Sequence, residues 1–174
     1  MLLFFILAPG FFIFSYWFLG FFNSIETYRE KRNLITAIVK PHQGDYVKSG
    51  GPVMDMIMAF QKAELRCDPI IIYRDDPQTT IKGLLNSEGG CILSEDQIPT
   101  TFKAAFPKFA EEKIQIVTLA PEPALRLTIK GHPALALRKI LAHVNELQAN
   151  EKIQGFPIIQ TVRADGRLDY WIHP

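Results

Sequence analysis

The sequence predicts an α+β fold in which a strand–helix–strand–strand unit occurs twice, preceded by one transmembrane helix. The prediction follows from an uncharged apolar run at the amino terminus, two long segments with apolar residues at helical spacing, and short apolar runs around each of them. A chain of 174 residues has room for one domain behind such a helix. We therefore divide it into a transmembrane anchor (1–23), a charged juxtamembrane collar (24–33) and one folded domain (34–174).

The amino-terminal run, Leu2 to Phe22, contains no charged side chain. About 20 apolar residues in a helix cross the hydrocarbon core, so this run predicts an anchor, with a kink at Pro9. A cleaved signal peptide and a buried core helix are the alternatives. A signal peptide would show a basic start and a small-residue cleavage site, and a helix that is apolar on all sides would need a larger protein around it.

The bases that follow this run set the predicted orientation. Arg29, Lys31 and Arg32 come after the anchor, whereas only the amino terminus precedes it. By the positive-inside rule, the sequence predicts a single-pass membrane protein whose folded domain faces the cytoplasm.

The first unit is predicted between residues 34 and 113. Leu34 to Lys40 has the branched residues of a strand, and the apolar residues of the next segment recur at helical spacing to about Arg66: Val53, Met56, Ile57, Phe60 and Ala63. Two glycine- and proline-bounded runs, 69–77 and 82–96, predict an antiparallel strand pair. Residues 98–113 predict a short helix broken at Pro107.

The second unit repeats this order. Residues 114–121 and 124–130 predict strands on either side of a proline turn, and a helix beginning at Pro133 carries the apolar stripe Leu137, Ile140, Leu141, Val144 and Leu147. Asp165-Gly166 is a strong hairpin signal for the last two strands. If the repeat is real, Ile72 and Gln160 occupy equivalent positions; chance similarity is the alternative, because few residues are identical.

Composition and motifs point away from several kinds of chemistry. Lysine and arginine are scattered at a net charge of +1, which predicts no nucleic-acid partner. Cys67 and Cys91 are too few for a disulfide framework, and in a cytoplasmic domain we expect them to stay reduced. The four histidines show no metal-ligand spacing, so the sequence predicts neither a metal site nor a cofactor.

No catalytic residue is predicted. Asp75 and Asp76 precede a proline and are typical of a solvated turn. Cys91 lies in an apolar run with no adjacent base, and Gly89-Gly90 lacks the lysine of a phosphate loop.

Several short motifs resemble the GyrI-like (SOUL/GyrI, effector-binding) domain. They are HQGDYVKSGG, IYRDDP, CILSEDQIP, the strands around APEP, FPIIQTV and DYWIHP, and the resemblance covers Leu34 to Pro174. The chain is most similar to the membrane-anchored subgroup, which includes the testis-expressed ER-phagy receptor of animals. This resemblance implies a curved antiparallel sheet backed by two helices, with a groove between the two halves that binds small organic molecules.

The resemblance also implies which residues line that groove. Tyr73, Gln160 and Trp171 would lie on its strands and Tyr46 near its mouth, although strand aromatics of this kind also occur as plain core. Many relatives have a glutamate where this chain has Gln160. An amide carries no charge to attract a cation, so we expect a neutral ligand.

The sequence therefore predicts a membrane-tethered domain that binds a small hydrophobic or amphiphilic, neutral ligand. Two alternatives stay open: an anchored adaptor that grips an unknown protein partner through its folded surface, and a small-molecule hydrolase. The glutamine at position 160 argues against the hydrolase, because related hydrolases use a pocket glutamate, although Glu88 could replace it.

Overall fold

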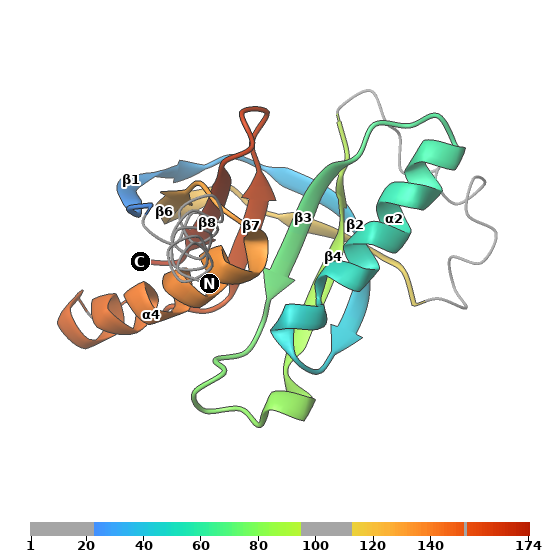
Figure 1. The fold of residues 1–174 in the computed structure, drawn as a ribbon. Coiled ribbons are helices and arrows are strands. Elements are labelled where there is room, and N and C mark those ends of the chain that lie inside the picture. Colours follow the sequence, from blue (N-terminus) through green and yellow to red (C-terminus); the bar gives the residue numbers. More distant parts are fainter. Residues whose placement is uncertain (1–22, 95–112, 152) are drawn as a thin grey trace, which may run out of the picture.

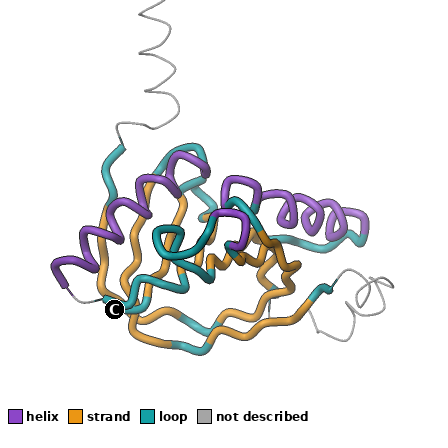
Figure 2. Tube along the Cα trace, turned by 90° about the horizontal axis from the view of Figure 1, so that it is seen from below, coloured by secondary structure: helices purple, strands orange, loops and turns teal. Residues whose placement is uncertain are grey.

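The computed structural model describes residues 23–94, 113–151 and 153–174. The described residues form one eight-stranded antiparallel sheet, with strand order β1-β6-β8-β7-β3-β4-β2-β5, and two helices longer than one turn. Figure 1 and Figure 2 show that both of these helices cover the same face of the sheet. The predicted α+β class and the sheet backed by two helices are confirmed.

Both repeats of the predicted unit are present. In the first, β2 (Ile35–Gln43) is followed by α2 (Gly50–Lys62), β3 (Asp68–Tyr73) and β4 (Asn86–Ile92). In the second, β6 (Glu122–Ile129) is followed by α4 (Pro133–Glu151), β7 (Ile158–Val162) and β8 (Leu168–Ile172). The two halves meet where β3 pairs with β7, at the centre of the sheet.

Each helix buries the centre of the stripe that its spacing predicts, and Ile57, Leu141 and Leu147 are half-buried against the same core. Val53, Met56 and Phe60 of α2 are buried, as are Ala136, Leu137, Ile140 and Val144 of α4. Short 3-10 turns, η1 (Tyr46–Lys48) and η2 (Lys82–Leu84), precede α2 and β4. The last hairpin turns at Gly166, whose φ of 78° is a left-handed conformation that glycine adopts without strain.

Two further strands extend the sheet beyond the predicted units. Residues of the predicted collar form β1 (Glu26–Arg32), which pairs with β6 along its whole length. Five of its seven residues, ETYREKR, are charged. A sequence this rich in charge is typical of a solvated linker, but it also suits an edge strand, which exposes one side to water. Because the two alternatives have the same composition, only the pairing with a distant strand shows which of them forms.

The strands on either side of the proline turn do not pair with each other, contrary to the expected strand pair around APEP. β5 (Gln115–Leu119) pairs with β2, while β6 pairs with β1 and β8. The chain therefore runs from one edge of the sheet to the other through β1–β2 and again through β5–β6. These two connections curl the sheet.

The alternation of side chains along the strands separates two layers of core. The helix-covered face carries the largest cluster, which includes Tyr73, Ile158 and Tyr170. The opposite face carries a second cluster around Ile72 and Ile159. Ile72 and Gln160 therefore face opposite sides of the sheet, and the predicted equivalence of these two residues is wrong.

The two cysteines form a disulfide between the start of β3 and the end of β4. Cys67 and Cys91 have a Cα–Cα distance of 5.0 Å and are separated by 24 positions in the sequence. The expectation that both stay reduced is corrected by this bond. The spacing of two cysteines does not reveal a pairing that depends on β3 and β4 lying side by side.

The structure contradicts the predicted localisation, which was a single-pass membrane protein with a cytoplasmic domain. Across residues 23–94, 113–151 and 153–174, no helix has the length and apolar character needed to cross a membrane. The predicted anchor in residues 1–22 lies outside the described residues, as does the short helix predicted within 98–113 up to residue 112.

Candidate functional site

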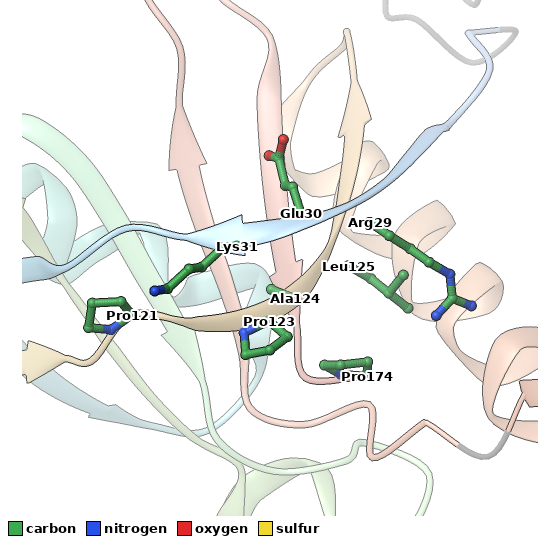
Figure 3. Close-up of a pocket in the computed structure, with 8 residues that line it drawn as sticks. All are labelled: Arg29, Glu30, Lys31, Pro121, Pro123, Ala124, Leu125 and Pro174. Carbon is green, nitrogen blue, oxygen red and sulfur yellow. The ribbon is translucent and has the colours of Figure 1, made fainter.

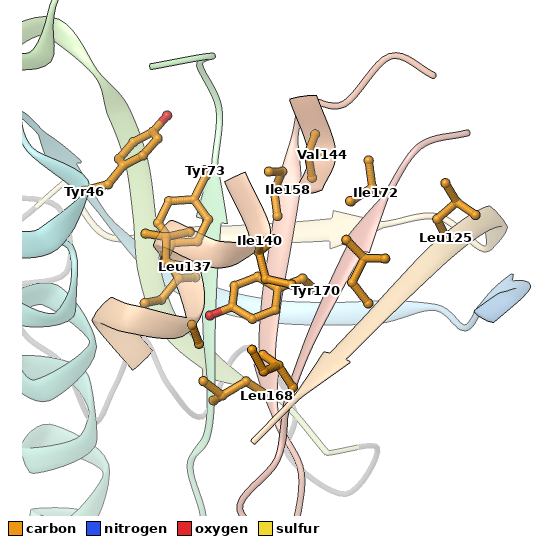
Figure 4. Packing of buried hydrophobic residues seen from close by; sticks show 14 of the residues in the cluster. Tyr46, Tyr73, Leu125, Leu137, Ile140, Val144, Ile158, Leu168, Tyr170 and Ile172 are labelled. Atoms are coloured by element: carbon orange, nitrogen blue, oxygen red, sulfur yellow. The ribbon is translucent and has the colours of Figure 1, made fainter. Parts of the chain in front are cut away.

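Three of the four predicted site residues come together beneath the helices. Tyr46 lies in η1, Tyr73 ends β3 and Gln160 lies in the middle of β7. Each is buried, with exposed fractions of 5%, 2% and 4%. Figure 4 shows Tyr46 and Tyr73 next to each other in this core, with Leu137 and Ile140 of α4 nearby. We call these three residues, with Tyr170 described below, the tyrosine cluster.

The aromatic rings of Tyr46 and Tyr73 contact each other edge to face. Their centroids are 4.8 Å apart at an interplanar angle of 61°. The Tyr46 hydroxyl donates to the carbonyl oxygen of Asp75 (2.7 Å) and accepts from the backbone N–H of the same residue (2.9 Å). Tyr46 therefore ties η1 to the turn after β3, and its polar atom is already satisfied.

A hydrogen bond across the centre of the sheet joins the two halves of the molecule. The Tyr73 hydroxyl donates to Oε1 of Gln160 over 2.8 Å, and both side chains are buried. A buried hydrogen bond of this kind stabilises the fold by about 0.5–1.5 kcal/mol, and leaving its acceptor unpaired costs more. The resemblance implied that these two residues share a groove, and the structure places them in contact.

Tyr170 completes the cluster and is a residue that the sequence reasoning missed. It is fully buried, lies opposite Gln160 in the β7–β8 register, and its hydroxyl has no hydrogen-bond partner. The hairpin signal alone could not have found it, because a two-residue turn at Asp165-Gly166 pairs residue 160 with residue 171. The structure has a three-residue loop instead, with the Arg163 N–H donating to the Arg167 carbonyl, and this register places Tyr170 opposite Gln160.

Trp171 lies on the opposite face of the sheet, away from the other three predicted residues. It packs against the second core cluster and donates its indole N–H to the Thr161 hydroxyl over 3.3 Å. Neighbouring residues of a strand point to opposite faces, so Tyr170 and Trp171 cannot line the same space. The structure therefore does not bring all four predicted residues into one groove.

Burial keeps the tyrosines of the cluster protonated. It raises the pKa of Tyr46 to about 12 and also raises the pKa values of Tyr73 and Tyr170. The cluster thus presents three hydroxyls and one amide, all uncharged near neutral pH. This set can donate and accept hydrogen bonds, but none of its groups can neutralise a cation.

The largest of the described cavities is distant from this cluster. It measures about 630 Å3 and is lined by β1, by the start of β6 and by Pro174. Figure 3 shows the side chains of Arg29, Glu30 and Lys31 pointing in different directions from β1, so they do not converge on a common point. None of the predicted site residues lines it.

Metal binding has no support in the described part of the chain, where no group of three or more histidine, cysteine or acidic side chains is close enough to hold an ion.

Comparison with known proteins shows which solved structures share this fold. Neither a family model nor a curated protein sequence matches the chain. Among solved structures, the EcmrR C-terminal domain aligns with a TM-score of 0.56 at 12% identity, over 86% of this chain and 96% of that domain. The chain has the fold of the EcmrR C-terminal domain.

Other solved structures agree. The integron cassette protein VCH_CASS2 of Vibrio cholerae aligns with a TM-score of 0.53 at 8% identity, over 84% of this chain and 94% of that one. The EcmrR chain in an EcmrR–DNA complex aligns with a TM-score of 0.58 at 9% identity over 86% of this chain, which spans only 57% of that EcmrR chain.

These likenesses are consistent with the GyrI-like fold that the motifs resemble, and they give no support for the membrane-anchored subgroup. At identities this low they show the fold alone. The ligand-binding roles of Tyr46, Tyr73, Gln160 and Trp171 are untested by them and stay predictions.

Proposed function

We propose that this chain binds a small, neutral organic molecule at the tyrosine cluster, between the helices and the sheet. The observation that carries the proposal is the unpaired hydroxyl of Tyr170. A buried hydroxyl without a partner costs about 1–3 kcal/mol, and a ligand that supplies an acceptor recovers much of it. The Tyr73–Gln160 pair beside it offers further polar contacts.

The preference for a neutral ligand follows from the chemistry of the cluster. Transferring a cation into a buried site is costly unless a negative charge compensates it, and neither the tyrosines nor Gln160 supply one. The amphiphilic ligand expected from a membrane tether is not part of this proposal, because the localisation on which it rested is wrong.

The cluster is closed in the structure, so binding requires movement of its cover. Leu137 and Ile140 of α4 pack over the tyrosines and are themselves buried (Figure 4). In this proposal, a shift of α4 away from the sheet exposes the Tyr170 hydroxyl. Ligand binding and displacement of α4 are therefore coupled in this proposal.

Thermal unfolding of the full chain tests the proposal with a matched pair of compounds. Triphenylphosphine oxide is neutral and carries a strong acceptor, whereas methyltriphenylphosphonium has the same three phenyl groups on phosphorus and a positive charge. A ligand at 100 times its dissociation constant stabilises the folded state by about 2.7 kcal/mol, which raises Tm by roughly 5 to 10 °C. We expect this shift with the neutral compound only.

Two variants locate the site. Tyr170→Phe should abolish most of the shift, since it removes the free donor, and Gln160→Glu should transfer the preference to the cation, because a buried carboxylate lacks any other counter-charge in the cluster. If the neutral compound raised Tm equally in the wild type and in both variants, the ligand would bind outside the tyrosine cluster. No stabilisation by either compound, nor by a wider panel of neutral acceptors, would refute small-molecule binding here.

A further inference from the structure

A second cavity lies on the face of the sheet that the helices leave uncovered. It measures about 430 Å3, within the range of small-molecule sites, and its lining includes Trp171, Thr161, Ile92, Arg32, Arg66 and Arg163. We call it the Trp171 cavity. It is separated from the tyrosine cluster by the sheet itself, because Thr161 and Trp171 alternate with Gln160 and Tyr170 along β7 and β8.

The wall of the Trp171 cavity is apolar and well fixed. Trp171, Ile35 and Ile92 all line it and pack against the buried cluster of the uncovered face. The hydrogen bond to Thr161 holds the indole, and the Arg126 guanidinium lies over its ring at 5.6 Å from the centroid. A tryptophan held in one orientation offers a flat surface to an aromatic ligand at little cost in side-chain entropy.

The polar part of the lining is predominantly cationic. Three guanidinium groups, those of Arg32, Arg66 and Arg163, accompany a single carboxylate, that of Asp68. Arginine presents a planar fork of N–H donors that matches a carboxylate, so this residue type suits recognition of an organic anion.

Arg32 is the most telling of the three. Its side chain is only 5% exposed, and its Nη2 contacts the Ala120 carbonyl at 3.0 Å and the Glu122 carboxylate at 2.9 Å. Its Nε is buried and has no hydrogen-bond partner. Arg32 lines the cavity and its unused donor lies beneath the cavity surface, so an anionic acceptor that reaches this donor would satisfy it.

The ion pairs of Arg66 and Arg163 allow their side chains to change orientation. Arg66 pairs with Asp68 at 3.1 Å with a side chain that is 77% exposed, and Arg163 lies 3.8 Å from Asp165, which Arg167 also contacts at 3.4 Å. Exposed pairs of this kind contribute little to stability, so these guanidiniums can turn toward a bound anion without a large loss.

We propose that the Trp171 cavity is a second ligand site, which binds a planar aromatic carboxylate. The ring lies against Trp171 and the apolar wall, and the carboxylate is held by Arg163 and Arg66, with the unused donor of Arg32 beneath them. This site is independent of the tyrosine cluster and differs from it in charge preference: the cluster selects a neutral molecule and the cavity an anion.

Tryptophan fluorescence reports on this site directly. The chain has two tryptophans, so Trp17→Phe in the full chain leaves Trp171 as the sole emitter. Biphenyl-4-carboxylate, biphenyl-4-methanol and biphenyl-4-methylamine share one ring system and differ in charge. We expect saturable quenching by the carboxylate, at least about tenfold weaker binding of the alcohol, and none of the amine.

Matched substitutions assign the charge effect. In the same background, Arg163→Gln should weaken carboxylate binding about tenfold and leave the alcohol unchanged, whereas Arg138→Gln, an identical change at an exposed position of α4, should have no effect. Tyr73→Phe should also leave carboxylate binding unchanged, because Tyr73 belongs to the other face.

Three outcomes would overturn the inference: no saturable quenching by the carboxylate, equal affinity for all three compounds, or equal behaviour of the Arg163→Gln and Arg138→Gln variants. Loss of binding in Tyr73→Phe would move the ligand to the tyrosine cluster and would equally reject a second site. The first three outcomes leave the proposal for the tyrosine cluster unaffected, whereas a carboxylate bound at the cluster would also contradict its preference for a neutral ligand.

Discussion

Individual hydroxyl groups distinguish the two central tyrosines of the cluster. Tyr73 and Tyr170 are equally buried, but only Tyr73 has a hydrogen-bond partner, Gln160. The same chemical deletion therefore has opposite expected effects at the two positions. Removing a satisfied hydroxyl leaves a buried acceptor without a donor, whereas removing an unsatisfied one relieves a penalty.

We predict that Tyr73→Phe lowers the free energy of unfolding by about 1–2 kcal/mol, while Tyr170→Phe changes it by less than about 0.5 kcal/mol or raises it. Urea denaturation of the two variants beside the wild type measures both values. Equal destabilisation by the two substitutions would mean that Tyr170 has a partner in solution, and the basis of the proposed ligand contact would be lost.

The pKa values of the tyrosines predict how stability depends on alkaline pH. Burial raises the pKa of Tyr46 from 10.0 to about 12, so the folded state holds a proton that the unfolded state releases. The stabilisation is complete below about pH 10 and is lost as pH rises through about 12. Tyr73 and Tyr170 act in the same direction.

Urea midpoints measured from about pH 8 to 11 should therefore fall steeply above pH 10. The urea midpoint of the Tyr46→Phe variant should fall less steeply, since one of the three buried tyrosine hydroxyls is gone. A flat profile in the wild-type protein would show that these hydroxyls are hydrated in the folded state.

At the scale of elements, the disulfide fastens the segment between α2 and β3 to the sheet. Cys91 is fully buried beside Phe60 and Met56 of α2, so the bond lies under the helix that covers the first half. Closing a loop of 24 residues restricts the unfolded chain and stabilises the fold by about 3 kcal/mol in the chain-entropy description.

We predict that a Cys67→Ala/Cys91→Ala variant loses about 2–4 kcal/mol of unfolding free energy, and that a reducing agent shifts the wild-type protein toward it but leaves the variant unchanged. Urea denaturation with and without reductant measures the free energy of unfolding, and mass spectrometry after alkylation counts the free thiols. Two free thiols in the purified protein, with no response to reductant, would contradict the disulfide.

At the scale of the whole molecule, two strand-to-strand connections of two residues each join the halves of the sheet. β1 continues into β2, and β5 into β6, so each crosses from one half to the other. β1 also covers the free edge of β6, whose Leu125 and Leu127 are buried, and brings Arg32 to Glu122. A strand that looks like a charged linker thus completes the fold.

We predict that a chain of residues 33–174, which lacks β1, unfolds at a lower urea concentration than one of residues 23–174 and self-associates, because the edge of β6 is uncovered. Size-exclusion chromatography and urea denaturation of the two chains compare them. Equal midpoints and a monomeric 33–174 chain would show that β1 is dispensable.

The sequence by itself determined the order of helices and strands, their buried stripes and the final hairpin. These depend on neighbours along the chain, whose 3.6- and 2-residue periods and turn residues are visible locally. It also brought Tyr46, Tyr73 and Gln160 forward, through the motifs that resemble a known domain.

Only the tertiary structure decided that charged residues 26–32 form a strand, that Cys67 meets Cys91, and that Trp171 faces away from Tyr73. Each depends on pairing between strands far apart in sequence. Strand pairing sets which residues share a face, and shifting the register by one position reverses it. For that reason the residues predicted for one groove lie on opposite faces of the sheet, in a cluster of uncharged tyrosines and beside a cavity edged with arginine.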